Sequence, residues 1–253
     1  MDYALGTRMK ENYEQRFRYF LSRRTYTIIR IDGKAFHTYT RGLIRPFDDG
    51  LIEDMDVTAK YLCKNVMNCK LGYVQSDEIT LVLCDFETNQ TDAWFDNNLQ
   101  KMASVSASMA TRAFNEARLK RLGVENMKWG EFDSRVFQIP QKQEVFNMLI
   151  WRQEDCTRNS IQSVAQSLFS QKELHGKNCN LLQELIFNKG INWNDYNAKY
   201  KRGRVIVKEF YEKETDSNNK LSEKAMRSRW ISVAPPIFTE AKDFLDNILP
   251  NNF

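Results

Sequence analysis

The sequence predicts an α+β fold, in which a ferredoxin-like βαββαβ unit carries an appended and mainly helical C-terminal half. Over residues 1–140, short segments rich in β-branched and aromatic residues alternate with two longer segments of helical periodicity. From residue 141 to about Gly190 the apolar spacing is helical. The 253 residues are 42% hydrophobic and 28% charged, which is enough to build a core and excludes a disordered chain.

The first strand and the helix after it have clear signals. Thr25–Ile31 (TYTIIRI) is rich in β-branched and aromatic residues and predicts a strand. Asp48 is a suitable N-cap for a helix from about Gly50 to Val66. Gly72 then opens a second strand, Tyr73–Gln75.

A hairpin and a second helix complete the unit. Polar Ser76–Glu78 predicts a hairpin tip, and Ile79–Cys84 (ITLVLC) returns as the third strand. The segment from about Asp92 to Leu119 has apolar or small residues spaced by three and four, which predicts a helix. Arg135–Ile139 is the fourth strand. In a βαββαβ unit, the end of the first strand and the hairpin tip lie close together on the central strands.

The second half differs in character. Residues 141–253 are expected to form a mainly helical region with a basic segment, packed on the unit of residues 1–140. The segment 213–228 is charged and lacks apolar periodicity, which predicts a surface loop or a mobile segment. Because no Gly/Ser-rich linker divides the chain, we expect one compact unit.

The composition excludes several classes of protein. No apolar run approaches the ~20 residues of a membrane-spanning helix and no signal peptide opens the chain, so we expect a cytoplasmic protein without a membrane partner. The five Cys include no CxxC pair, which argues against a disulfide scaffold or a zinc site. With only two His, a metal site must rest mainly on carboxylates, which favour magnesium or manganese.

The net charge of +4 is unevenly distributed. Residues 1–45 carry ten Lys and Arg against four acidic residues, residues 199–230 carry ten against five, and residues 46–198 sum to −5. Two basic segments around an acidic middle could form a groove for a polyanion. The alternative is that they are ordinary solvated surfaces.

Three carboxylates are predicted to meet at one edge of the sheet. Asp32 ends the first strand, and Asp77 and Glu78 lie at the hairpin tip. Like charges brought together repel and normally need a cation, and oxygen ligands select magnesium. Gly33 allows a sharp turn, so its carbonyl could also face the metal. Two such ions can activate an attacking oxygen and stabilise a leaving pyrophosphate. The alternative is a plain turn at Asp32-Gly33 and a hairpin loop at Asp77.

Short motifs follow one another along the chain. The first two are Arg30-Ile31-Asp32-Gly33 with Phe36-His37, and Tyr73-x-Gln75-Ser76-Asp77-Glu78. The later ones are Lys101 before Ser104 and Ser108, Phe132-Asp133-Ser134-Arg135, Trp151-Arg152-Gln153-x-Asp155-Cys156 with Asn159-Ser160, and Gly190-Ile191-Asn192-Trp193-Asn194 before Lys201-Arg202-Gly203. In this order, from about residue 5 to 210, they resemble the tRNA-histidine guanylyltransferase family, the reverse (3′-to-5′) polymerases.

The resemblance implies a polymerase-type palm that adds nucleotides to the 5′ end of tRNA. The implied catalytic residues are Asp32, Asp77 and Glu78, with two Mg²⁺ held by Asp32, Asp77 and the Gly33 carbonyl. ATP or GTP, as activating and substrate nucleotides, would be bound by Lys34, Ala35, Phe36, His37, Arg45, Ser76 and Asp77. RNA phosphates or the RNA 5′ end would be bound by Lys101, Ser104, Arg135, Arg152, Asn159, Lys201 and Arg202. The family also implies a homo-tetramer.

The chain departs from the eukaryotic pattern after Asp155-Cys156. The eukaryotic run is DCHINN, whereas here Thr157 replaces the His and Ser160 the second Asn. The Lys-Asn-Glu run expected before Gly190 is also absent. These differences resemble the branch associated with template-directed repair of 5′-truncated tRNAs. We therefore expect repair rather than addition of the extra 5′ guanosine of histidine tRNA.

Two functions of other classes are alternatives. A palm-type nucleotide cyclase also needs two acids on a ferredoxin-like sheet, but it carries no tRNA-binding half. A non-catalytic RNA-binding protein would have no reason to keep repelling carboxylates together.

Overall fold

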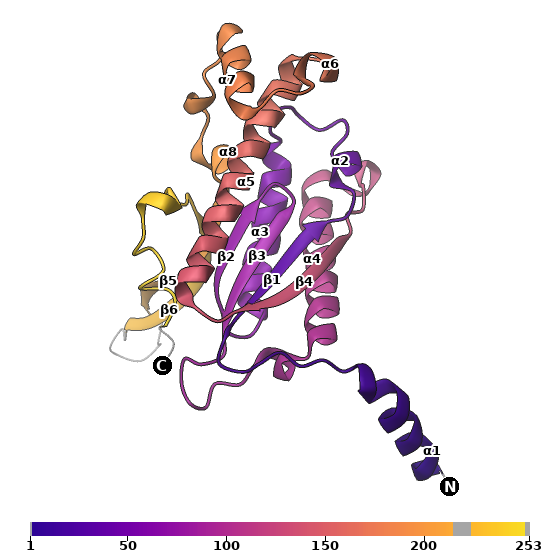
Figure 1. Ribbon diagram of the computed structural model, residues 1–253. Coiled ribbons are helices and arrows are strands. Elements are labelled where there is room, and N and C mark those ends of the chain that lie inside the picture. Colours follow the sequence, from indigo (N-terminus) through magenta and orange to yellow (C-terminus); the bar gives the residue numbers. More distant parts are fainter. Residues whose placement is uncertain (1, 215–223, 251–253) are drawn as a thin grey trace.

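The computed structural model describes residues 2–214 and 224–250, and its described part contains a six-stranded antiparallel sheet (Figure 1). The strands lie in the order β4-β1-β3-β2-β5-β6. Their bounds are β1 Tyr26–Gly33, β2 Cys69–Gln75, β3 Glu78–Cys84, β4 Phe132–Ile139, β5 Arg204–Glu214 and β6 Lys224–Val233.

Helices cover both faces of this sheet. Helices α3 and α4 cover one face and the long helix α5 crosses the other (Figure 1). No helix in residues 2–214 and 224–250 is long and apolar enough to cross a membrane. The helix bounds are α1 Asp2–Met9, α2 Phe36–Tyr39, α3 Asp49–Asn65, α4 Leu99–Leu122, α5 Lys142–Leu168, α6 Gln171–Leu174, α7 Cys179–Asn188 and α8 Ala198–Lys201.

The predicted order of elements is confirmed. The first four strands with α3 and α4 follow one another as βαββαβ, so the α+β, ferredoxin-like class is correct. Asp48 caps α3 as expected, because its Oδ1 accepts a hydrogen bond from the Leu51 amide at 2.7 Å. The predicted start of α4, at about Asp92, is seven residues too early, since the helix begins at Leu99. Residues 95–97 have positive φ angles, and the helix begins only after Asn98, whose side chain accepts from the Lys101 amide at 3.0 Å.

The central strands present two different faces. Ile29 and Ile31 of β1 pack with residues of α3 and α4, whereas Tyr26 and Ile28 pack with residues of α5. Because successive side chains of a strand point to opposite faces, the face that carries Tyr26 and Ile28 also carries Arg30 and Asp32. The polar end of β1 therefore faces the same side of the sheet as α5.

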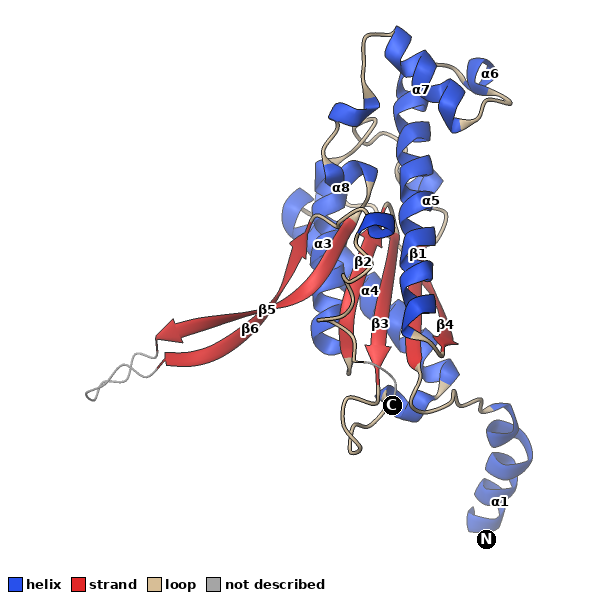
Figure 2. Cartoon of the chain, turned by 60° about the vertical axis from the view of Figure 1, so that its left-hand side comes forward, coloured by secondary structure: helices blue, strands red, loops and turns tan. Residues whose placement is uncertain are grey.

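Strands β5 and β6 were not predicted. They extend the palm sheet from its β2 edge and form a hairpin that projects from the body (Figure 2). The prediction of a loop over 213–228 was wrong for Lys213, Glu214 and Lys224–Ser228, which belong to these strands. Residues 215–223 of that segment lie outside the described residues. The division into residues 1–140 and 141–253 stays a prediction.

Candidate active site

The end of β1 and the turn between β2 and β3 lie against each other. The Gly33 amide donates to the Asp77 carbonyl at 3.1 Å, and Asp32 is the register partner of Glu78. Within the turn, the Ser76 hydroxyl donates to Asp77 Oδ1 at 2.9 Å. The adjacency predicted from the βαββαβ order is therefore present, and it brings Asp32 and Asp77 to the same edge of the sheet.

Gly33 is required at this position by a close contact. A Cβ at residue 33 would lie 2.3 Å from Cδ2 of the Phe36 ring. That ring cannot retreat easily, because it is 3% exposed and packs on Phe132 and Phe114 at centroid distances of 5.1 and 5.6 Å. The Phe36 side chain thus belongs to the core and does not line the neighbouring cavity, whereas the resemblance implied a nucleotide contact at this residue.

Polar residues form rows across the strands on the α5 face. Register partners on β4, β1, β3 and β2 give one row of Asp133, Asp32, Glu78 and Gln75. The next row on this face contains Arg135 and Arg30. Arg135 Nη2 lies 3.7 Å from Asp32 Oδ2 and 3.4 Å from Asp133 Oδ1. Guanidinium groups therefore lie directly beside the carboxylates.

The carboxylates are electrostatically strained. Burial raises the pKa of Asp77 to about 6, with the charges of Asp32 and Glu78 adding to the effect and the Ser76 hydrogen bond opposing it. Burial and the charge of Asp133 raise the pKa of Asp32, against the lowering effect of the Arg135, Arg30 and Arg152 guanidiniums. Desolvated carboxylates that repel each other gain free energy when a cation binds.

The donor set fits magnesium. Asp32, Asp77 and the Gly33 carbonyl are hard oxygen donors, and Mg²⁺ is usually held by one or two carboxylates together with substrate phosphates. Within residues 2–214 and 224–250 there is no group of three or more His, Cys, Asp or Glu side chains that could enclose a metal ion. Two carboxylates would leave coordination positions for water and substrate phosphates.

Glu78 has a different partner. Arg152 holds its carboxylate at both oxygens, with Nε–Oε1 at 2.8 Å and Nη2–Oε2 at 2.9 Å. Arg152 Nη2 also donates to Asp155 Oδ2 at 2.6 Å. Glu78 is 8% exposed and Arg152 is 6% exposed. This buried pair joins the β2–β3 turn to α5, so both side chains are engaged with each other rather than directed at a ligand.

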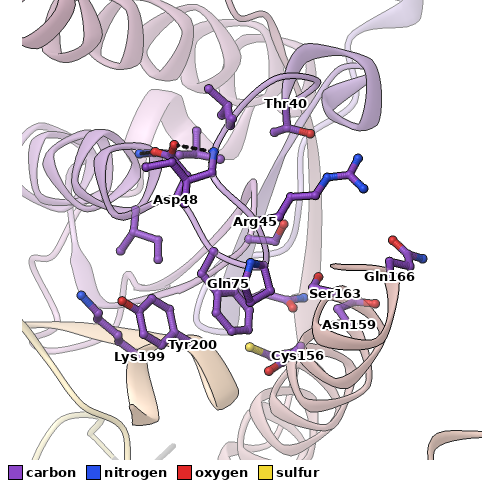
Figure 3. Close-up of a pocket in the computed structure, with 18 of the residues that line it drawn as sticks. Thr40, Arg45, Asp48, Gln75, Cys156, Asn159, Ser163, Gln166, Lys199 and Tyr200 are labelled. Carbon is purple, nitrogen blue, oxygen red and sulfur yellow. Dashed lines mark hydrogen bonds between the residues drawn. The ribbon is translucent and has the colours of Figure 1, made fainter. Parts of the chain in front are cut away.

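A cavity of about 300 Å³ (Figure 3) adjoins the cleft that contains Asp32 and Asp77, because Gln75 and Ser76 line both. His37, Arg45 and Ser76, three of the expected nucleotide-binding residues, line it. Asn159 of α5 lines both this cavity and the cleft that contains Asp32 and Asp77. Tyr200 forms another part of the wall and is stacked on Phe47 with a centroid distance of 4.6 Å. The cavity and the carboxylate cleft therefore share part of their walls.

Two expected RNA-binding residues, Lys101 and Ser104, lie in the first turns of α4. This helix packs on the sheet face that carries Ile29 and Ile31, opposite to the face of Asp32. Asp32 is at the end of β1. The Ser104 hydroxyl donates back to the Gln100 carbonyl at 2.7 Å. The structure does not bring these two residues to the carboxylates.

Of four further expected binding residues, Lys34, Lys201 and Arg202 make contacts within the protein, and Ala35 is exposed. Lys34 Nζ pairs with Glu131 at 2.7 Å on the surface. Lys201 is 7% exposed and its Nζ donates to the Asn194 carbonyl. Ala35, with φ 54°, precedes α2 and is exposed. The Arg202 carbonyl accepts from the Tyr73 hydroxyl at 2.7 Å.

Sequence reasoning missed several residues of the cleft. Arg30, Asp155 and Trp151 line it with the predicted residues. Trp151 is 47% exposed, with the guanidinium carbons of Arg30 and Arg152 at 5.5 and 4.3 Å from its ring centroid. The period of two in β1 places Arg30 on the same face as Asp32, and this signal could have identified it.

Comparisons with known proteins agree on one family. A family model described as "Thg1: tRNAHis guanylyltransferase" matches residues 6–140. A solved bacterial tRNA(His) guanylyltransferase (Thg1)-like protein in complex with ATP is 42% identical, with a TM-score of 0.87, and the match covers 97% of this chain and 99% of that one. The corresponding complex with GTP is 41% identical, with a TM-score of 0.79 and coverage of 97% and 98%. The tRNA(His) guanylyltransferase of Schizosaccharomyces pombe is 26% identical over 209 residues, 78% of each chain.

Proposed function

Since the chain belongs to the tRNAHis guanylyltransferase family, we propose that it is a template-dependent 3′-5′ nucleotidyltransferase that repairs the 5′ end of tRNA in the cytoplasm. The observation that carries the proposal is that Asp32 and Asp77 line one cleft, which shares Ser76 and other lining residues with the cavity lined by His37 and Arg45. The relatives solved with ATP and GTP support nucleotides as its ligands.

The side chains divide the work of phosphoryl-type transfer. Asp32, Asp77 and the Gly33 carbonyl would hold magnesium, which would supply charge neutralisation and activation of the attacking hydroxyl when bound. Arg135 and Arg30, in the row next to Asp32, provide cations for the phosphates. Such transfer depends mainly on positioning and electrostatic stabilisation. The Glu78–Arg152 pair keeps the turn that carries Asp77 fixed on α5.

The two residues that depart from the eukaryotic pattern support repair. The Thr157 hydroxyl donates to the Lys201 carbonyl at 3.2 Å, and Ser160 Oγ accepts from Trp193 Nε1 at 2.9 Å. Both side chains thus join α5 to the segment that follows α7. At the positions of the eukaryotic His and Asn, this chain therefore has side chains that hold two of its own segments together. This difference favours repair over histidine-tRNA guanylylation.

A direct assay tests this function. Incubated with Mg²⁺, four nucleoside triphosphates and a tRNA lacking its first 5′ nucleotide, the protein should extend the RNA at the 5′ end. Substrates with a 5′-monophosphate and a 5′-triphosphate are tested in parallel, since the triphosphate needs no activation. Failure to extend either substrate would refute the nucleotidyltransferase assignment, and cyclic nucleotide as the only product would favour a cyclase.

The N-terminal segment supports a homo-tetramer. Helix α1 and the turns after it extend away from the body (Figure 1). Along them, four apolar residues spaced by four are 48–64% exposed: Leu5, Met9, Tyr13 and Phe17. Contiguous exposed apolar surface commonly marks a protein–protein contact. We propose that this N-terminal apolar patch packs on another copy of the chain.

Disruption of the patch should dissociate the assembly. Tyr13→Ser combined with Phe17→Ser should lower the mass measured by light scattering after size exclusion from that of a tetramer to that of a smaller species. Phe210→Ser, at an equally exposed residue of β5 (66% exposed), is the control and should leave the mass unchanged. A wild-type protein that elutes as a monomer would contradict the proposal.

A further inference from the structure

An exposed tryptophan lies in the carboxylate cleft. Trp151 of α5 lines this cleft together with Asp32, Asp77 and Arg135, and it is 47% exposed. A single exposed aromatic residue on an open surface needs no explanation. This one lies inside a concave site beside the carboxylates, where a ligand is expected to bind. The indole is therefore a candidate contact for that ligand.

A fixed guanidinium supports the indole. The guanidinium carbons of Arg152 and Arg30 lie 4.3 and 5.5 Å from the ring centroid. Arg152 is 6% exposed and bonds to both oxygens of Glu78, so it cannot move away readily. The ring is thus held by a cation on a buried anchor while nearly half of its surface stays accessible. A side chain ordered in advance binds a flat partner at a low cost in conformational entropy.

The charges around the ring favour a nucleic acid as the partner. Arg135 lies opposite Arg30 in the strand register, and its side chain is 53% exposed. An aromatic ring beside exposed cations is the combination that binds RNA ends, because the cations meet phosphates and the ring meets a base. Stacking also tolerates every base, since each has a π face. This tolerance suits an enzyme that extends RNA ends of different sequence.

The position of Trp151 along α5 distinguishes RNA from the free nucleotide. Asn159 and Ser163 of the same helix line the cavity that contains His37 and Arg45 (Figure 3), whereas Trp151 lines only the cleft. At a rise of 1.5 Å per residue, Trp151 lies about 12 Å along the helix from Asn159 and about 18 Å from Ser163. The cleft has a volume of about 340 Å³. With the nucleotide in the cavity, this part of the cleft remains for the second substrate of a transfer reaction.

We propose that Trp151 binds the RNA substrate by stacking on its terminal base, with the 5′ phosphate of that end at Asp32 and Asp77. Arg152 supports the indole from within the protein, and Arg135 meets a backbone phosphate. Stacking covers a face of the base and leaves its hydrogen-bonding edge free for pairing. This inference rests on the proposed 5′ nucleotidyltransferase function.

Two substitutions of Trp151 test the stacking. Trp151→Leu keeps an apolar side chain but removes the ring, and Trp151→Phe keeps a ring without the indole N–H. A fluorescently labelled tRNA that lacks its first 5′ nucleotide is titrated with each protein in Mg²⁺ without nucleoside triphosphates, and anisotropy is measured. The Leu variant should bind about 10-fold more weakly than the wild type, and the Phe variant within about 3-fold of it. Trp129→Leu is the matched control, because Trp129 is 67% exposed but lines neither cleft nor cavity, and its affinity should be unchanged.

Two further readouts separate RNA binding from a general disturbance of the site. In the extension assay, Trp151→Leu should raise the KM for RNA and leave kcat close to that of the wild type. Calorimetric titration without RNA should give the same affinity for GTP in the wild type and in both Trp151 variants, since the ring lies outside the nucleotide cavity.

Each contrary outcome points to a different error. Equal RNA affinities of the wild type and Trp151→Leu would overturn the stacking role. A Phe variant as weak as the Leu variant would also overturn it and would indicate the indole N–H instead. A loss of GTP affinity in the absence of RNA would assign the ring to the nucleotide. All three leave extension by the wild type intact, whereas a wild-type protein that neither binds nor extends this RNA would overturn the proposed function together with the inference.

Discussion

Asp77→Asn should abolish 5′ nucleotide addition and, at the same time, stabilise the metal-free protein. Loss of a carboxylate from a site of two should lower the rate by on the order of 10³-fold. The folded pKa of Asp77 is raised to about 6 by burial, so the folded state binds this proton more tightly than the unfolded state. The resulting destabilisation is absent below the unfolded pKa, grows as the pH rises towards 6, and is complete above it. At pH 7 it amounts to about 2–3 kcal/mol.

Thermal unfolding and the rate of extension measure both effects. In metal-free buffer at pH 7 the variant should melt at a higher temperature than the wild type, and the difference should vanish near pH 4. Added Mg²⁺ and nucleotide should raise the melting temperature of the wild type much more than that of the variant. Asp96→Asn, at a residue whose side chain is 76% exposed, is the control and should change neither quantity. A destabilised Asp77→Asn protein would contradict the electrostatic account.

Arg152→Met should produce the largest loss of stability in the site. Removal of Arg152 leaves the Glu78 carboxylate buried and unpaired, which typically costs about 3–5 kcal/mol. Adding Glu78→Gln removes the buried charge, so the double variant should recover much of the loss. Urea unfolding measures these differences. Arg158→Met is the matched control, because Arg158 pairs with Asp155 on the same helix but its side chain is 48% exposed. An exposed pair of this kind is worth about 0–1 kcal/mol.

The alternative for Arg152 is direct contact with RNA, as the resemblance implied. That role predicts a different pattern: Arg152→Met would be as stable as Arg158→Met, and only the affinity for tRNA would fall. If the double variant with Glu78→Gln were no more stable than Arg152→Met alone, the account of Arg152 as the partner of a buried carboxylate would likewise be contradicted.

The palm could be predicted because its signals are local. A short stretch of sequence is enough to recognise each of its features: the two hairpin strands, the Asp48 cap and the periodic helix. The βαββαβ order then brings Asp32 next to Asp77. The β5–β6 hairpin leaves no such pattern. Its outer part projects from the body, with Phe210 and Met226 66% and 65% exposed, so no apolar face distinguishes it from a loop.

The site was predictable only in part because motif neighbours serve different purposes. Phe36 and His37 are adjacent, yet the first is in the core and the second lines the cavity. The Glu78–Arg152 pair joins residues 74 positions apart, and no pattern in the neighbouring sequence predicts it. Lys201 appears in a basic run but is buried against Trp193. A short motif identifies the region of a site, whereas the tertiary packing decides which side chains reach the ligand.

The identity of the added nucleotide tests template-dependent repair most directly. Four 5′-triphosphorylated tRNAs that lack their first nucleotide, each with a different base opposite the gap, are extended with all four nucleotides and the products sequenced. Repair predicts that the added base is the Watson–Crick partner of the opposite base in each of the four. Addition of G in every case would contradict repair and would assign the chain to guanylylation instead.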